Sequence, residues 1–406
     1  MPNERELSAD GSFRAEVVVP VSEGLIQATG LSGATFDGIQ FEHSAFSFGA
    51  SGFVDLQDGI HGIGNGSNAA VPGAFACENC SDVTVQRCGF RQLGGSAVDF
   101  GGVAKRCVVD STTIDDTACS GVQISAMTCG DCRSVNCSDE TIQPTGNKVV
   151  NTSITRAGRE FSGCVAFAAG CNVGLLATHN TLRDLPYGGF SVGCGAAYAG
   201  FARDNVISWN RIERWMLQMQ DSAGVYMSGV QPNSTVHHNY IARKGLTGLE
   251  PRPTCDAPLA GPPRRCSAAQ VLAVEDLWIR GLRACSKYNA CSCSRTSPRG
   301  FCNQTGNAHG GGIYPDNGSA GWRAFANVLE DVYHALFIWD SKKMMNMSFV
   351  GSWTDSLLFT NNAAKHRVVI DGNVFVNRSA GEAWPKEAQA VVDGAGTEAD
   401  AEGAKE

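Results

Sequence analysis

The 406-residue sequence is poor in charge and in long apolar runs. Only 18% of its residues are charged, the formal net charge is −8, and Lys and Arg form no basic stripe. Nucleic acids are bound through clustered basic side chains, so the composition argues against a nucleic-acid-binding protein. The most apolar stretch, GCVAFAAGCNVGLLATH, is short and interrupted by Gly and Asn, so it predicts no membrane span.

Long Leu-, Glu- and Lys-rich stretches are also missing, whereas glycine is abundant with 48 residues. This combination favours a β-rich architecture with many turns.

Cysteines and potential glycosylation sites are frequent. There are 17 cysteines, a density that a reducing compartment rarely favours, so we expect a secreted protein or one of the secretory pathway. The N-terminus, MPNERELSADG, has no basic-then-apolar signal, and we expect this start to be truncated. Sequons of the N-x-[ST] type occur at Asn65, Asn79, Asn136, Asn151, Asn233, Asn303, Asn317, Asn346 and Asn377.

Two Cys-x-x-Cys pairs occur, Cys77/Cys80 and Cys129/Cys132. Neither has a clear second Cys pair or a His pair at the spacing that a zinc site needs. We therefore expect disulfides or buried thiols, no bound metal and no cofactor. A cysteine-rich segment, 247–306, predicts an inserted loop with its own disulfides. The acidic, Ala- and Gly-rich end, 381–406, is expected to be disordered. The segment's cysteines are Cys255, Cys266, Cys285, Cys291, Cys293 and Cys302.

A short pattern recurs along the chain: Asn or a small polar residue, any residue, an apolar anchor, and then a second apolar strand. The spacing is mostly in the twenties, apart from the interval that contains the cysteine-rich segment, which is typical of a solenoid. The anchors are Phe90, Ile114, Ile154, Leu182, Ile212, Ile241, Leu329, Phe349 and Phe375.

The repeat predicts an all-β fold, a right-handed parallel β-helix, over 28–246 and 307–380, with 1–27 as a lead-in. Leucine-rich repeats would show Leu at fixed offsets, and ankyrin or tetratricopeptide repeats would need helices. Asn at a fixed turn position suits stacked coils, because Asn tolerates a left-handed backbone and can bond to its neighbours above and below.

The second strands of five repeats align as FSVG, VYMS, IYPD, FIWD and LFTN. Alternation along a strand predicts that their first residues face inward; these are Phe190, Val225, Ile313, Phe337 and Leu358. The outward positions then hold Tyr226, Tyr314, Ser228, Asp316, Asp340 and Asn361. Asp316 and Asp340 would lie about one strand spacing, or 5 Å, apart. Two negative charges at so short a distance raise the pKa of one carboxyl group, which makes an acid available near neutral pH.

A third acid, Asp221, precedes the strand VYMS, although Ser222–Gly224 leave its direction open. Acids beside aromatic rings on an open solenoid face are typical of a carbohydrate groove. The expected catalytic residues are Asp221, Asp316 and Asp340, and the expected substrate-binding residues are Tyr226, Tyr314, Trp215, Asn317 and Asn361. The alternative for Asp316 and Asp340 is simple turn chemistry.

The ordered stretches FDGIQFEHSAFS, HNTLRDLPYGGFSVG, DSAGVYMSGVQPNSTVHHNYI and GGGIYPDNGSAGWRAFANVLEDV resemble glycoside hydrolase family 141, within the pectate-lyase-like β-helix proteins, over 31–379. The resemblance implies an α-L-fucosidase- or xylanase-like activity on cell-wall polysaccharides. It maps the family's catalytic aspartates onto Asp221, in QDSAGVYMSG, and Asp316, in YPDNGS. The first motif departs from the family's Asp-Gly-Gly-Ile-Tyr, so the substrate is not carried over.

Three functions compete. The leading hypothesis is a monomeric glycoside hydrolase that acts on a plant or algal cell-wall-type polysaccharide with an Asp pair. A polysaccharide lyase or epimerase on uronate-containing glycans would need a base, and Ca²⁺ or Arg to neutralise the uronate. The outward positions offer acids and no Lys or Arg, which argues against a lyase or epimerase. Tyr226 or Tyr314 as the base, with Ca²⁺ at the aspartates, would support that alternative. The third is a non-catalytic glycan-binding protein.

Deletion of 247–306 tests the predicted insertion. We expect the solenoid to stay folded, with an unchanged far-ultraviolet circular dichroism spectrum, because loop length contributes little to closure entropy. Loss of the β-sheet spectrum in the shortened chain would show that the segment is part of the fold.

Overall fold

The computed structural model describes residues 18–47, 54–55, 57, 60–62, 68–125, 141, 143–193, 202–245, 310–338, 346–356 and 367–397. The chain divides into two units, Met1–Gly245 with His309–Glu406, and Leu246–Ala308. The second unit, and with it the predicted insertion at 247–306, lies outside the described residues.

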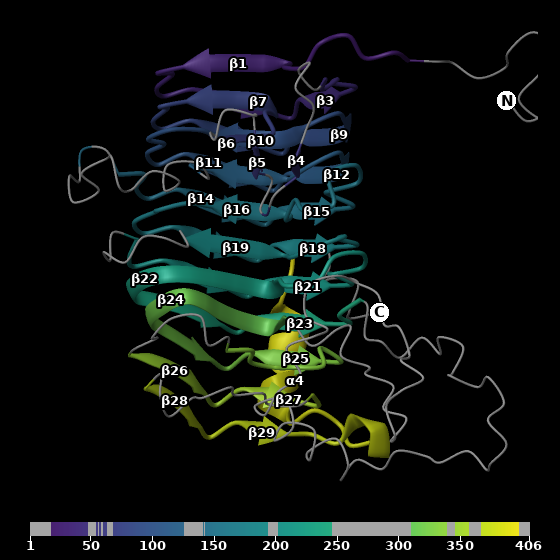
Figure 1. Cartoon of the computed structure of the whole chain (residues 1–406), viewed down its shortest axis with the longest axis vertical. Helices are drawn as coiled ribbons and strands as arrows, with labels where there is room; N and C mark the ends of the chain where they lie inside the picture. Colours follow the sequence, from purple (N-terminus) through teal and green to yellow (C-terminus); the bar gives the residue numbers. More distant parts are fainter. Residues whose placement is uncertain are drawn as a thin grey trace, which may run out of the picture. The chain divides into compact units, whose positions relative to one another are not determined.

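The first unit is a parallel β-helix with three faces, as predicted (Figure 1). The first face contains β1 (Ile26–Thr29), β7 (Gly73–Glu78), β10 (Ser96–Phe100), β13 (Val122–Ile124), β16 (Phe167–Ala169) and β19 (Phe190–Gly193). Two long strands, β22 (Ala223–His237) and β24 (Gly311–Phe325), run through the first face and on into the second.

The second face contains β2 (Thr35–Asp37), β8 (Thr84–Gln86), β11 (Val108–Asp110), β14 (Lys148–Val150), β17 (Leu176–Thr178), β20 (Val206–Ser208), β26 (Met347–Val350) and β28 (Val368–Asp371). The third contains β3 (Gln40–Glu42), β9 (Gly89–Leu93), β12 (Thr113–Thr117), β15 (Ser153–Thr155), β18 (Thr181–Arg183), β21 (Arg211–Glu213), β23 (Tyr240–Ala242), β25 (Val328–Glu330), β27 (Trp353–Thr354) and β29 (Val374–Phe375). Equivalent strands of successive coils pair in parallel.

The interior is filled by the predicted anchor column on the third face. From Phe90 to Leu329 the anchors lie opposite one another in register, one per coil. Phe349 does not belong to this column. It lies on β26 in the second face, opposite Ala324, and Thr354 takes the anchor position between Leu329 and Phe375.

Glycines on the first face make room in the interior for long apolar side chains that point inward from the third face. A Cβ atom at Gly224 would lie 2.5 Å from Cγ2 of Ile241, and one at Gly312 would lie 2.3 Å from Cδ2 of Leu329. Only glycine admits so close an approach. The Gly-rich entries to the strands VYMS and IYPD are therefore packing requirements of the interior.

An asparagine ladder holds the turn between the second and third faces, as the repeat predicts. Asn180, Asn210, Asn239 and Asn327 are all buried. The Oδ1 atom of Asn239 accepts bonds from both the backbone N (3.0 Å) and Nδ2 (2.9 Å) of Asn210. Nδ2 of Asn210 also donates to the Ala177 carbonyl at 3.0 Å, so each amide bonds to the coils on both sides.

A shorter ladder lies at the turn between the first and second faces. Nδ2 of Asn147 donates to Oδ1 of Asn172 at 3.0 Å, and Nδ2 of Asn205 donates to Oε1 of Gln231 at 3.0 Å. Two corners of the coil are thus fixed by buried amides.

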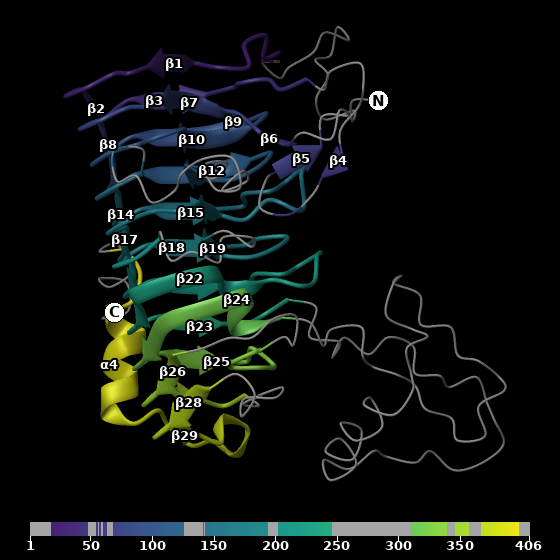
Figure 2. The ribbon, with the colours of Figure 1, turned by 60° about the vertical axis from the view of Figure 1, so that its left-hand side comes forward.

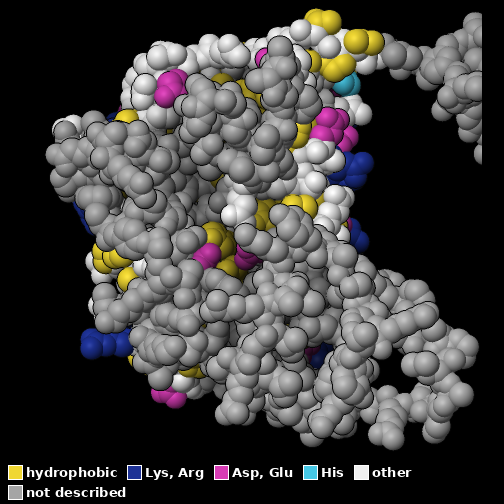
Figure 3. All heavy atoms as spheres, in the orientation of Figure 1, with side chains coloured by type: hydrophobic (Ala, Val, Ile, Leu, Met, Phe, Trp, Pro, Cys, Tyr) yellow, Lys and Arg dark blue, Asp and Glu magenta, His cyan; other side chains and the backbone are white. Residues whose placement is uncertain are grey.

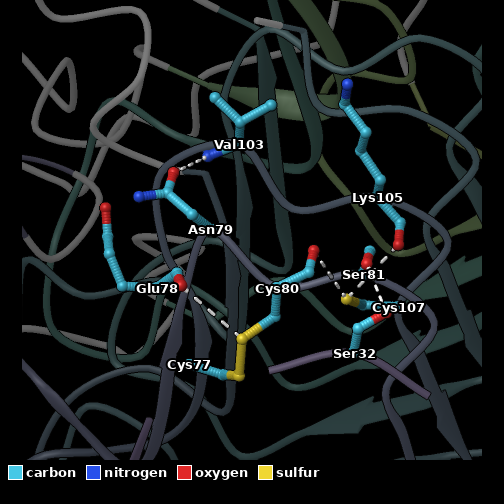
Figure 4. Close-up of a disulfide and its surroundings, with 9 residues drawn as sticks. All are labelled: Ser32, Cys77, Glu78, Asn79, Cys80, Ser81, Val103, Lys105 and Cys107. Atoms are coloured by element: carbon cyan, nitrogen blue, oxygen red, sulfur yellow. Dashed lines mark hydrogen bonds between the residues drawn. A yellow bond between two sulfur atoms is a disulfide. The ribbon is translucent and has the colours of Figure 1, made fainter. Parts of the chain in front are cut away.

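Two disulfides join described cysteines: Cys77–Cys80 and Cys119–Cys164. The first confirms a disulfide in that Cys-x-x-Cys pair and closes the corner after β7, where Sγ of Cys107 lies 3.6 Å from the Cys80 carbonyl oxygen (Figure 4). Cys88 and Cys107 are buried free thiols. The second pair, Cys129/Cys132, lies outside the described residues.

The C-terminal segment corrects the sequence prediction. A 3₁₀ turn, η4 (Arg378–Ala380), leads to helix α4 (Lys386–Gly394), so the part of the expected disordered tail that the structure describes is ordered. Figure 2 shows α4 beside the last coils. Arg211 donates to the Val392 and Ala395 carbonyls at 2.6 and 3.2 Å. The apolar side chains that pack with Tyr240 and Val328 recur at helical spacing, at Trp384, Ala388, Val391 and Ala395.

A small antiparallel sheet stands outside the stack of coils (Figure 2). It consists of β4 (Val54–Asp55), β5 (Ile60–Gly62) and β6 (Asn68–Ala70), which pair in sequence order. It matters for the site because Gln57 lies between β4 and β5.

Substitution Asn210→Ala tests the ladder. It leaves the Asn180 amide and the Ala177 carbonyl with unpaired buried groups, so we expect the free energy of unfolding to fall by about 2–4 kcal/mol, the cost of one or two such groups. Thermal and urea unfolding measure the change. Gln389→Ala, at an exposed position on α4, is the control and should shift the midpoint little. Equal shifts in the two variants would refute a ladder-specific role.

Candidate active site

Asp221 occupies the corner that leads into β22, and its backbone is left-handed. Its φ is +67°, a conformation that Asp tolerates better than most residues. The hydroxyl of Tyr187 donates to the Asp221 carbonyl at 2.6 Å, and Nε2 of Gln57 donates to that hydroxyl at 2.7 Å. The corner is thus held from two directions, while the Asp221 side chain is exposed.

Parallel pairing of β22 with β24 brings the second acid to the same place. Tyr226 lies opposite Tyr314, and Ser228 lies opposite Asp316, in the predicted register. The residues immediately before the two tyrosines, Val225 and Ile313, are buried in the interior. Because side chains alternate along a strand, Tyr226 and Tyr314 lie on the outer side. The stretch PDNGS produces a register shift just after Asp316, where the Ser319 hydroxyl donates to the Asp316 carbonyl at 2.8 Å.

The two acids and the two tyrosines are bonded crosswise. Tyr314 on β24 donates to Oδ1 of Asp221 at 3.3 Å, and Tyr226 on β22 donates to Oδ2 of Asp316 at 2.9 Å. The two rings meet edge to face with centroids 5.0 Å apart. In Figure 3, acidic and hydrophobic side chains lie next to each other near the middle of the side that Figure 1 shows.

Burial sets the protonation of Tyr314. Only 1% of the residue is exposed. Burial first, and then the charges of Asp221 and Asp316, raise the pKa of the Tyr314 phenol far above its usual range. The phenol therefore stays protonated at neutral pH and acts as a hydrogen-bond donor to Asp221.

Two predicted site features are wrong. Trp215, expected to contact substrate, is completely buried in the interior cluster. Phe337, expected to face inward opposite Ile313, packs instead on the outer side against Tyr314, with ring centroids 4.8 Å apart. Leu336 is the residue paired with Ile313, one position earlier than predicted.

Three further predicted site residues are not placed. Asp340 and Asn361 lie outside the described residues, as does Leu358. Asn317 belongs to β24, but the structure describes nothing of its side chain. Their roles stay predictions.

Sequence reasoning missed a second acid pair on the same face. Asp99 stands in the outward column that continues through Gln123, Ala168 and Ser191 to Tyr226. It lines a cavity of about 420 Å³ together with Glu78. Burial, followed by the charge of Glu78, raises the pKa of Asp99 to about 7. The column alignment that found Asp316 would also have found Asp99, had it been extended toward the N-terminus.

Within the described part of the chain, no three His, Cys, Asp or Glu side chains gather as a metal site would require. No described helix is long and apolar enough to cross a membrane.

Comparison with known proteins adds a fold relative. No protein-family model matches the sequence, and neither does any curated protein. One solved structure, of a glycoside hydrolase, matches 98% of this chain with a TM-score of 0.62 and 18% identity. This chain spans 56% of that protein's length. The likeness shows a shared fold: the chain is a parallel β-helix of a kind found in a glycoside hydrolase.

Two structures of a GH136 lacto-N-biosidase from Eubacterium ramulus, one native and one with selenomethionine, also match, each at 10% identity. They cover 91% and 86% of this chain with TM-scores of 0.37 and 0.36, and this chain covers 65% and 62% of theirs. These scores are too low to support an argument. The resemblance to family 141 stays a prediction.

Substitution Asp99→Asn tests the raised pKa. A carboxyl whose pKa rises on folding, here from 3.8 to about 7, favours the folded state at low pH. That stability is lost as the pH rises through about 7. Asn mimics the neutral carboxyl throughout. We therefore expect wild type and variant to melt alike at about pH 4, and the variant to melt higher at about pH 8.

The control for this titration is Asp204→Asn, at an exposed carboxylate. Its melting difference from wild type should not change across the same pH range. A pH-independent difference for Asp99→Asn as well would contradict the assignment.

Proposed function

We propose that the chain is a glycoside hydrolase that acts on a plant or algal cell-wall-type polysaccharide, with Asp221 and Asp316 as its acid pair. The observation that supports this most directly is the crosswise bonding. One carboxylate lies at the corner before β22 and the other on β24, and each accepts a hydrogen bond from a tyrosine of the neighbouring coil. The fold shared with a glycoside hydrolase agrees with it.

The two carboxyl groups differ in solvent exposure, and this suggests their roles. Asp316 is 9% exposed and is held by Tyr226, so it is suited to deliver a proton to the glycosidic oxygen from a fixed position. Asp221 is exposed, so it is suited to activate water that reaches it from solvent. This division of work is that of glycosidases with paired carboxyl groups.

The tyrosines act as donors in this scheme. Because the pKa of Tyr314 is raised, its hydroxyl remains a donor that orients Asp221. The edge-to-face contact with Tyr226 fixes both rings, and each hydroxyl reaches a different acid. Each carboxyl group is thereby held by a tyrosine of the neighbouring coil.

A lyase or epimerase on a uronate-containing glycan is the alternative. It would need a base, and the protonated Tyr314 is a poor one. Under this alternative Ca²⁺ would bind between the acids and the substrate carboxylate. Its signature is an unsaturated or epimerised product.

An extracellular, monomeric protein is part of the proposal. The disulfides Cys77–Cys80 and Cys119–Cys164 support an oxidising compartment, since disulfides persist there.

Substitutions Asp316→Asn and Asp221→Asn test the acid pair. The change keeps the shape and removes the charge and the titratable proton, so we expect hydrolysis to fall by about two orders of magnitude or more. The assay measures reducing ends released from a panel of xylan, fucosylated xyloglucan and pectin. The melting temperature should change little.

The exposed Asp204 again supplies the control, and Asp204→Asn should keep wild-type activity. Full activity of Asp316→Asn would show that the site is wrong. Unsaturated products from wild type would favour the lyase, and binding of a glycan without turnover would favour a non-catalytic protein.

A further inference from the structure

The outer face of the solenoid is closed beside the acid pair on its N-terminal side. Gln123, Ala168 and Ser191 precede Tyr226 in the outward column, one per coil. Their positions would be exposed on an open groove. They are 0%, 2% and 5% exposed, so this part of the face is not available to a ligand.

Tyr187 and Gln57 contribute to this closure, and we call them the Gln57–Tyr187 wall. Tyr187 packs over Ala168 and Val165 and is itself buried. Its hydroxyl joins Gln57, from the small sheet outside the coils, to the Asp221 carbonyl. The wall therefore ends directly at one of the two acids.

Phe337 closes the opposite side. It packs against Tyr314 from the following coil and is 2% exposed. Of the described strands, β22 and β24 lie between the coil of Tyr187 and that of Phe337. These two coils are therefore three strand spacings, or about 14 Å, apart.

Along the strands, the first face is also short. The part of β22 that pairs with β19, Val225–Ser228, has four residues, which span about 13 Å, before the strand passes on into the second face. A long glycan would find a continuous path on a β-helix only along the stack of coils, where successive strands extend the surface. Here that path is blocked on both sides of the acids.

We propose that the site takes the end of a glycan chain and releases the terminal sugar or a short terminal unit, with the Gln57–Tyr187 wall as the barrier to internal binding. This inference rests on the proposed function, because it assumes that Asp221 and Asp316 cleave a glycosidic bond. It adds that cleavage takes place at the end of the glycan chain and not inside it, which the acid pair alone does not define.

The size of the products distinguishes the two modes. The probe is the panel polysaccharide that wild type hydrolyses, among xylan, fucosylated xyloglucan and pectin, followed at low conversion by size-exclusion chromatography. We expect one small sugar product while the mean polymer size falls slowly. A rapid fall in polymer size, with a spread of oligosaccharides, would overturn the proposal and leave the hydrolase function intact. If no polysaccharide is cleaved, the proposed function fails and this inference fails with it.

The wall is tested by Gln57→Ala, which removes the hydrogen bond from Gln57 to the Tyr187 hydroxyl, and by Tyr187→Phe, which removes both hydrogen bonds of that hydroxyl. We expect the ratio of terminal release to internal cleavage to fall several-fold in both, with oligosaccharides appearing among the products. The control Gln389→Ala, at an exposed position on α4, should keep the wild-type ratio. Loss of activity with an unchanged ratio would mean that the pair only supports Asp221, and it would overturn the role of the wall.

Discussion

The structure depends on one constraint, that every coil turns from the second to the third face at a fixed point. A left-handed residue makes the turn, such as Trp209 with φ +55° or His238 with φ +54°, and in the four coils of the ladder a buried asparagine follows it. The side chain of Asn210 bonds backbone groups of the preceding coil and the Asn239 side chain of the following coil. Buried polar groups that are fully paired specify a unique arrangement, so the ladder fixes the register of all strands that follow.

Register is what brings the candidate site together. Asp221 and Asp316 are 95 residues apart in the numbering of the chain, and the segment Leu246–Ala308 lies between them. Their tyrosines meet only because β22 and β24 pair with Val225 opposite Ile313. Gly224 in β22 and Gly312 in β24 belong to the same constraint, since they leave room in the interior for Ile241 and Leu329.

The sequence was informative where a pattern repeats and misleading where it is locally ambiguous. The anchor column and the register of Phe190, Val225 and Ile313 follow from periodicity. In ALFIW five apolar residues are adjacent, so alternation could not decide whether Leu336 or Phe337 faces inward. Trp215 was wrongly expected to contact substrate because a corner residue has no strand alternation, and the interior gains most from burying a large ring. The bond from Tyr187 to Asp221 leaves no trace in any repeat.

The same architecture explains how a site and its surroundings can vary independently. The segment Leu246–Ala308 lies in the sequence between β23 and β24, and because longer loops cost little in closure entropy, we expect the parallel pairing of β22 with β24 not to depend on its length. Asp316 and the two tyrosines lie on β22 and β24, and Asp221 lies at the corner that leads into β22. Gln57, in contrast, comes from the small sheet outside the coils. The proposed chemistry is therefore tied to the stacked coils, whereas the proposed barrier depends on a residue from outside the stack.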